Sequence, residues 1–144
     1  MNSVERVFAA LRGEQPDRVP VMEFLIDESV ARAAAPGCRD VADCMDRLGL
    51  DAVACGAFFH VTDENCGGTH VDEWGVTYKR GPEAVPHPVA GPIRTLEDAR
   101  VWQAPDPDAP HRLGQLPELV KRYKGRRTIC FHHRAAFMWS AYLL

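Results

Sequence analysis

The sequence predicts an α/β fold in which short parallel strands alternate with helices and a β-hairpin lies outside the main sheet. Three short apolar runs, at residues 18–26, 50–59 and 127–131, indicate buried strands. Segments with helical periodicity separate these runs, an order typical of parallel βαβ units. A further run over residues 73–79 alternates apolar and polar residues, which predicts a strand with one apolar face.

The N-terminal half contains three predicted helices, each bounded by capping or helix-breaking residues. The first helix begins at a capping box of Asn2 and Glu5 and ends at Gly13. The second covers residues 27–35 and is broken by Pro36 and Gly37. The third is capped by Asp40 and ends at Gly49. In the first helix the apolar residues recur at i, i+3, i+4 and i+7, namely Val4, Val7, Phe8 and Leu11. This helix is therefore predicted to have one apolar face.

The alternating run forms the predicted hairpin. Trp74 packs its inner face, and we expect Asp72 and Glu73 to be solvated or paired with Lys79 and Arg80. This stretch is therefore interpreted as a wall of the fold and not as a reactive centre.

The C-terminal half returns to alternating helices and strands. Residues 82–92 are rich in proline and predict a loop, and Thr95 with Asp98 is a second potential capping box. Pro117 suits the first turn of a helix, in which Leu119, Val120 and Tyr123 form the inner face. A final helix begins at residue 134.

Composition excludes several classes of protein. The net charge of -3 does not indicate a basic surface for binding nucleic acid. No run approaches the roughly 18 apolar residues of a membrane span. The five cysteines are odd in number and lack CxxC spacing, which argues against a disulfide framework and for a reducing compartment. A cytoplasmic location is expected.

The final helix indicates that the domain is larger than residues 1–144. Residues 135–144 are apolar on nearly every face, and such a helix needs neighbours on all sides. We therefore expect residues 1–144 to be a fragment, the N-terminal part of a single larger domain.

Several motifs resemble the uroporphyrinogen decarboxylase family. The start of the chain, RVFAALRGEQPDRVPV at residues 6–21, is similar to the start of that family, as is LGLDAV at residues 48–53. DEWGV at residues 72–76, His87-Pro88 and W-x-x-P-D-P at residues 102–107 resemble a branch that includes corrinoid-dependent methyltransferases and O-demethylases. The resemblance runs over essentially the whole chain.

The resemblance implies a fold and an activity. The family fold is a (β/α)8 TIM barrel, of which this chain would be the N-terminal portion with a β-hairpin excursion. The methyltransferase branch moves a methyl group from a small methylated substrate to a corrinoid protein. It uses zinc, whose ligands would lie beyond Leu144, so no cofactor is expected within residues 1–144.

Two alternatives remain, a porphyrinogen decarboxylase that needs no cofactor and an inactive fragment. The decarboxylases have two arginines after the first strand, which would pair with substrate carboxylates. The corresponding positions are about Leu25 and Ser29, and the family's aspartate at the end of the second strand falls near Phe58. These departures disfavour decarboxylation of uroporphyrinogen.

Substrate-binding residues are expected at the C-terminal ends of the barrel strands, where sites of this fold lie. The candidates are Glu23, Asp27, His60, His132 and Arg134. As an alternative to binding substrate, Glu23 would be a structural carboxylate in a salt bridge and Asp27 would cap a helix. Because adjacent side chains diverge, at most one of His132 and His133 is expected to face the barrel mouth.

A second set of potential ligands lies around the hairpin and consists of His60, Asp63, Glu64, Cys66, His70 and Asp72. Zinc prefers such side chains, but their spacing matches no compact metal motif, and Gly67-Gly68 indicates a flexible loop. We expect no metal site there.

Overall fold

A computed structural model describes residues 1–65, 68–81 and 85–144, which form two compact units. The first unit comprises residues 1–57 and 113–132, and the second comprises residues 58–112 and 133–144. The first contains a parallel sheet and the second an antiparallel sheet. The mixed α/β class is confirmed, while the described residues form no closed barrel.

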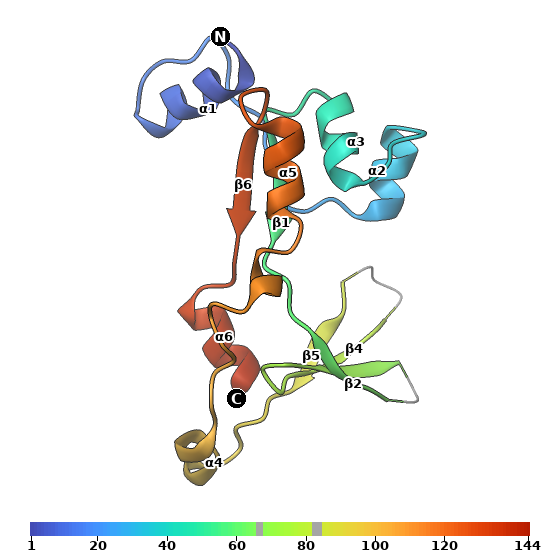
Figure 1. The fold of residues 1–144 in the computed structure, drawn as a ribbon, viewed down its shortest axis with the longest axis vertical. Helices are drawn as coiled ribbons and strands as arrows, with labels where there is room; N and C mark the ends of the chain where they lie inside the picture. The colour runs from blue at the N-terminus through green and yellow to red at the C-terminus, as the bar shows by residue number, and fades with distance from the viewer. Residues whose placement is uncertain (66–67, 82–84) are drawn as a thin grey trace. The chain divides into compact units, whose positions relative to one another are not determined.

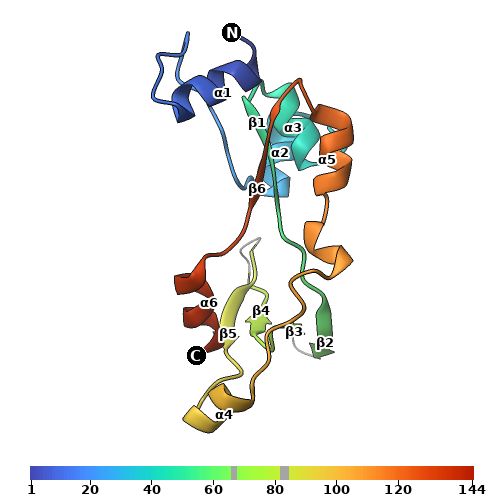
Figure 2. The same ribbon diagram turned by 60° about the vertical axis from the view of Figure 1, so that its left-hand side comes forward.

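In the first unit three helices precede the first strand, and one helix separates that strand from the second (Figure 1). Its elements are α1 (Ser3–Leu11), α2 (Glu28–Ala34), α3 (Val41–Arg47), β1 (Ala52–Gly56), α5 (Leu116–Tyr123) and β6 (Thr128–His132). Strands β1 and β6 pair in parallel, with Ala52 opposite Thr128 and Gly56 opposite His132. Helix α5 lies alongside both strands in Figures 1 and 2. Two of the three predicted main-sheet strands are thus confirmed.

The core of this unit lies between α3, α5 and β1. Met45, Val53, Leu119 and Tyr123 are almost completely buried there. Leu119 and Tyr123 were predicted on the inner face of α5, but Val120 from the same prediction is exposed. The helical period therefore identified two of the three core positions.

The predicted first strand is wrong. Residues 18–26, all of them described, form no strand, and the apolar side chains of Val19 and Phe24 are 81% and 64% exposed. The amide of Asp51 donates to the carbonyl of Val21 at 2.8 Å, but no ladder continues from there. Pro20 has no N–H to donate, and an apolar run becomes a strand only where a partner strand satisfies its backbone.

Helix α1 begins with the predicted capping box of Asn2 and Glu5. Its apolar face is only half buried, because Val7 is in the core while Leu11 is 74% exposed. Arg6 instead occupies the buried side. The apolar face indicated by the periodicity is therefore buried only in part.

Arg6 is buried because it binds Asp51, the centre of an ionic cluster. The fully buried Asp51 carboxylate accepts from Arg6 Nη1 at 2.6 Å, Arg18 Nη1 at 2.7 Å and the Val21 amide at 2.9 Å. Burial opposes ionisation, but these hydrogen bonds outweigh it and hold the pKa of Asp51 below its usual range. The cluster fixes the loop after α1 to the start of β1.

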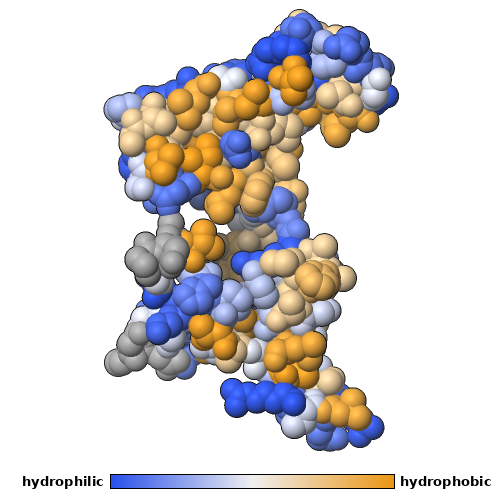
Figure 3. Space-filling view, turned by 180° about the vertical axis from the view of Figure 1, so that it is seen from behind, coloured by the Kyte–Doolittle hydropathy of each residue, from blue (hydrophilic) through white to orange (hydrophobic). Residues whose placement is uncertain are grey.

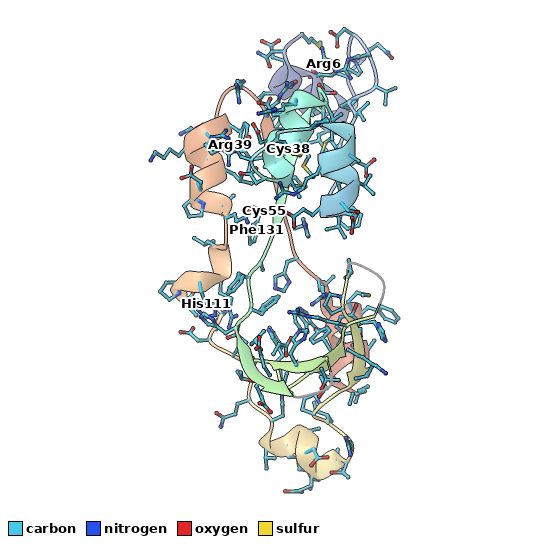
Figure 4. The ribbon with its side chains drawn as sticks, turned by 90° about the vertical axis from the view of Figure 1, so that its right-hand side faces the viewer. Arg6, Cys38, Arg39, Cys55, His111 and Phe131 are labelled. Atoms are coloured by element: carbon cyan, nitrogen blue, oxygen red, sulfur yellow. A yellow bond between two sulfur atoms is a disulfide. The ribbon has the colours of Figure 1, made fainter. Side chains whose placement is uncertain are left out.

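The sequence argued against a disulfide framework, yet one pair of cysteines is joined. Cys38 and Cys44 are joined by a disulfide, visible beside the Cys38 label in Figure 4. Cys44 lies on α3, and Cys38 lies in the turn before it. The sequence offered neither CxxC spacing nor an even cysteine count as a signal for this pair. Cys55 and Cys130 are free.

The second unit is built on a four-stranded antiparallel meander (Figure 2). Its elements are β2 (Val61–Asn65), β3 (Thr69–Asp72), β4 (Thr77–Lys79), β5 (His87–Ala90), α4 (Leu96–Val101) and α6 (Ala136–Leu143). A 3-10 helix, η1 (Pro110–Leu113), contributes its first three residues to this unit. The strands follow the order β2-β3-β4-β5. A hairpin outside the main sheet is therefore confirmed, in a larger form than predicted.

Two boundaries in this unit differ from the prediction. The predicted strand over residues 73–79 is split by a turn, with only Thr77–Lys79 forming β4, although Val76 and Tyr78 are buried as their alternation indicates. Residues 82–84 of the predicted loop lie outside the described residues, and β5 replaces the part at residues 87–90. Pro88 is tolerated in β5 because this is an edge strand.

Helix α6 is apolar all round, as predicted, and is only partly covered. Trp139 is buried against Trp74, with ring centroids 4.0 Å apart, while Phe137 is 80% exposed. The Ile93 amide donates to the Leu143 carbonyl at 2.9 Å, and a Cβ at Gly91 would collide with that carbonyl. This close approach explains the glycine at position 91.

Apolar side chains also reach the surface of the first unit, as orange patches in Figure 3. They do not mark a bilayer-crossing helix, since none of the helices in the described ranges has the length and apolarity for that.

Candidate functional site

The most highly connected polar cluster of the second unit is centred on Glu73, in the turn between β3 and β4. The Asp72 carboxylate shapes this turn by accepting from the amides of Trp74 and Val76, both at 3.0 Å. Gly75 completes it with a φ of 79°, a conformation that glycine adopts without strain. The turn thereby holds Glu73 in a defined direction.

Glu73 binds three residues from other segments of the unit. Arg112 donates to both carboxylate oxygens, through Nη1 to Oε1 and through Nη2 to Oε2 at 3.0 Å. His111 Nε2 lies 3.1 Å from Oε1, and the His60 amide donates to Oε1 at 2.9 Å. The bidentate guanidinium contact is the strong and directional form of this ion pair. The pairing with Lys79 or Arg80 expected from the sequence is therefore wrong.

The surroundings of Glu73 keep it ionised. Burial works against the charge, but hydrogen bonds from Arg112, the His60 amide and His111 outweigh burial and lower the pKa of Glu73 to about 2. Glu73 is thus a permanent acceptor and not a general acid. Its charge orients the imidazole of His111, as a carboxylate does for a histidine in many sites.

His60 completes the cluster and is its most exposed member. Its ring centroid lies 3.8 Å from that of His111, with the two planes inclined by 50°. Figure 4 labels His111 on η1. The arrangement presents an accessible imidazole, His60, against an inner one held by a fixed carboxylate. It is suited to hydrogen bonding and proton exchange with a polar ligand.

His60 was predicted as a site residue, whereas Glu73 was interpreted as structural, and His111 and Arg112 were missed. Glu73 and Arg112 are 39 residues apart in the chain, so no local spacing signals their pairing. The adjacent histidine and arginine after Pro110 were the available signal.

His132 lies at the C-terminal end of β6, in the first unit. A Cβ on Gly56, its partner in β1, would lie 3.0 Å from His132 Cε1, so the imidazole covers the end of β1. The Phe24 ring packs against it edge to face at 5.6 Å. This is the position at which a side chain of a parallel sheet meets ligand.

The other candidates of the first unit have simpler surroundings. Glu23 is exposed in the loop before α2. Asp27 is the N-cap of α2, the alternative already open from the sequence, and it accepts from the Ser29 hydroxyl, from the Ser29 amide at 2.8 Å and from the Val30 amide at 3.3 Å. These bonds, that from the Ser29 hydroxyl first, lower the pKa of Asp27.

Arg134 lies in the second unit among aromatic rings. Its guanidinium carbon is 4.9 Å from the ring centroid of Tyr142 and 5.5 Å from that of Trp139. The neighbouring His133 has different contacts from His132, since its ring packs against Phe59 at 5.6 Å.

The described side chains do not fit the zinc that the family resemblance implies. Among residues 1–65, 68–81 and 85–144, no three His, Cys, Asp or Glu side chains gather closely enough to hold a metal ion. Cys66, one of the potential ligands around the hairpin, lies outside those residues. No chemical step is therefore assigned to zinc in this chain.

Comparisons of the chain with protein-family models, with curated proteins and with solved structures find no match.

Proposed function

We propose that the chain is the N-terminal part of a uroporphyrinogen decarboxylase family protein that moves a methyl group from a small methylated substrate to a corrinoid protein. The motifs at residues 6–21, 48–53 and 72–76 support the family. The parallel pairing of β1 with β6, with α5 alongside, is compatible with a portion of a (β/α)8 barrel. A cytoplasmic location belongs to the same proposal.

The observation on which the choice of reaction rests is the state of the arginines in the first unit, all of whose residues are described. Each of them forms an ion pair with a carboxylate of the chain; they are Arg6, Arg12, Arg18, Arg32, Arg39, Arg47, Arg122, Arg126 and Arg127. At the positions of the family's two substrate arginines, Leu25 is exposed and the Ser29 hydroxyl donates to Asp27.

A porphyrinogen has several carboxylates and needs cations that are free to meet them. A guanidinium already paired with an internal carboxylate would have to break that pair first, and a charge-assisted hydrogen bond contributes about 1.5–3 kcal/mol. The arginines of the first unit are therefore not free to bind a substrate with several carboxylates. This supports methyl transfer over decarboxylation.

The Glu73 cluster supplies a polar contact for such a substrate. Glu73 holds His111 by charge, and His111 in turn packs against His60. The exposed His60 imidazole would donate to, or accept from, a polar group of the substrate. The corrinoid, when its protein is bound, supplies the nucleophile that accepts the methyl group.

The test is an assay of the protein at its full natural length with two sets of substrates. A panel of methoxy and methylamine compounds is incubated with cob(I)alamin, and methylcobalamin is followed by its absorbance. Uroporphyrinogen is incubated separately and carbon dioxide release is measured. We expect methylcobalamin with at least one donor. Carbon dioxide from uroporphyrinogen without any methylcobalamin would establish the decarboxylase alternative instead, and inactivity in both assays would count against both reactions.

A further inference from the structure

Three aromatic rings of the second unit form a box around one cation. Tyr78 on β4 and Tyr142 on α6 meet at 84°, with centroids 6.3 Å apart, and Trp139 meets Tyr142 at 78° and 6.3 Å. Tyr78 and Trp139 are buried, so their faces are held in place. Nearly perpendicular rings directed at one point present several negative π faces to a cation at that point.

Arg134 occupies this box. Its guanidinium carbon lies 4.9 Å from the Tyr142 centroid, 5.5 Å from Trp139 and 5.9 Å from Tyr78, all within the range of cation–π attraction. Its hydrogen bonding is poor, with a contact of 3.4 Å from Nη1 to the Tyr78 hydroxyl. Within the described residues no carboxylate is close enough to form an ion pair with it. The box therefore binds its cation through ring faces and hardly uses N–H donors.

A buried carboxylate lies near the box. Asp72 is almost fully buried and is bound by the amides of Trp74 and Val76, with no ion-pair partner among the described residues. Burial raises the pKa of Asp72, and the positive charge of Arg134 acts in the opposite direction. When it is ionised, this carboxylate adds an attraction for any cation held in the box.

We propose that Tyr78, Trp139 and Tyr142 form a binding site for a small quaternary ammonium compound, with Arg134 filling the site when no ligand is present. A quaternary ammonium has no N–H groups, so its affinity depends on ring faces, which is the form of recognition that this box offers. A guanidinium offers five donors and would gain more from a carboxylate. Arg134 is therefore a displaceable occupant.

The role of this ligand as the methyl donor rests on the proposed function. In that reaction the C–N bond to one methyl group breaks, and its electron pair stays on nitrogen as the lone pair of a neutral tertiary amine. The new bond to the methyl group takes its electron pair from the reduced corrinoid of the partner protein, which is oxidised by two electrons. The amine leaves neutral, so the step needs no proton.

Binding is tested directly on the full chain, by titrating tetramethylammonium and choline while following tryptophan fluorescence, to which Trp139 contributes. Removing the internal cation in Arg134→Ala should tighten binding by about tenfold, because one cation–π competitor is lost. Arg134→Lys keeps a cation and should bind like the unmodified protein. In the Arg134→Ala background, Tyr142→Leu should weaken binding by about tenfold, whereas Tyr142→Phe keeps the ring and should not.

The neutral analogue 3,3-dimethylbutan-1-ol has the shape of choline without its charge. If it binds Arg134→Ala as tightly as choline, or if no ammonium binds that variant while its thermal unfolding is unchanged, the proposal is overturned. The assay of methyl transfer is a separate measurement. Binding without methyl transfer would leave the ammonium site standing and count against the proposed function alone. Methyl transfer only from methoxy donors, without ammonium binding, would count against the site alone.

Discussion

Replacing Glu73 with glutamine should destabilise the second unit, because it removes the carboxylate that lies between Arg112 and His111. The fall in the pKa of Glu73 from 4.5 to about 2 corresponds to on the order of 3 kcal/mol of stabilisation in the ionised form. The Glu73 side chain is 14% exposed, so solvent screens part of this effect and roughly 2 kcal/mol is expected.

The same reasoning predicts a dependence on pH. Because the folded-state pKa of Glu73 lies below its unfolded value, the stabilisation is complete above about pH 4.5 and is lost as the pH falls through about 2. Glu73→Gln has no carboxyl proton to bind, so its free energy of unfolding should depend less on pH across that window.

Urea unfolding followed by tryptophan fluorescence measures both effects, since Trp74 and Trp139 stack in this unit. Glu97→Gln is the matched control, because Glu97 is an exposed glutamate of the same unit whose ion-pair partner among the described residues is the exposed Arg100. It should unfold within about 0.5 kcal/mol of the unmodified protein. If Glu73→Gln unfolds like this control, and the two share one pH profile from 4.5 to 2, the ionic cluster does not stabilise the unit.

Two further predictions concern the first unit. Asp51→Asn should lower the free energy of unfolding of this unit by about 3–5 kcal/mol, because Arg6 and Arg18 would lose a fully buried anion. Urea unfolding followed by circular dichroism measures the change. A loss below about 1 kcal/mol would contradict the stabilising role of the Asp51 cluster. Alkylation of the unfolded protein without reductant should leave Cys38 and Cys44 unlabelled in a peptide mass map, whereas prior reduction should expose both; labelling of the pair without reduction would contradict the disulfide.

Short-range chemistry was predictable from the sequence alone. The capping boxes of Asn2 with Glu5 and of Thr95 with Asp98, the N-cap at Asp40 and the first-turn Pro117 all occur as predicted. Each is decided by contacts among residues a few positions apart, so the local sequence contains the necessary information. The strands at residues 52–56 and 128–132 were also predictable, because both are short apolar runs between helices.

Tertiary structure decided whether a segment formed a strand where the local sequence alone gave the wrong prediction. Residues 18–26 have the apolar composition of a strand, yet they have no strand to pair with and remain irregular. Residues 87–90 look like a loop because of Pro88, yet they form β5, since β4 offers an edge to which they can pair. A strand exists only with its partner, and the partner is distant in sequence.

The candidate site divides in the same way. From the sequence, His60 and Arg134 were candidates for their type and position, and Asp72 and Glu73 were interpreted as residues of a hairpin strand, solvated or paired with Lys79 and Arg80. The path of the chain through the second unit decided two further contacts. It brings Glu73 to Arg112, which is 39 residues away in the chain. It also places Arg134 among the rings of Tyr78, Trp139 and Tyr142. Ion pairs and cation–π contacts are fixed by distances of a few ångströms in space, and separation along the chain places no constraint on them.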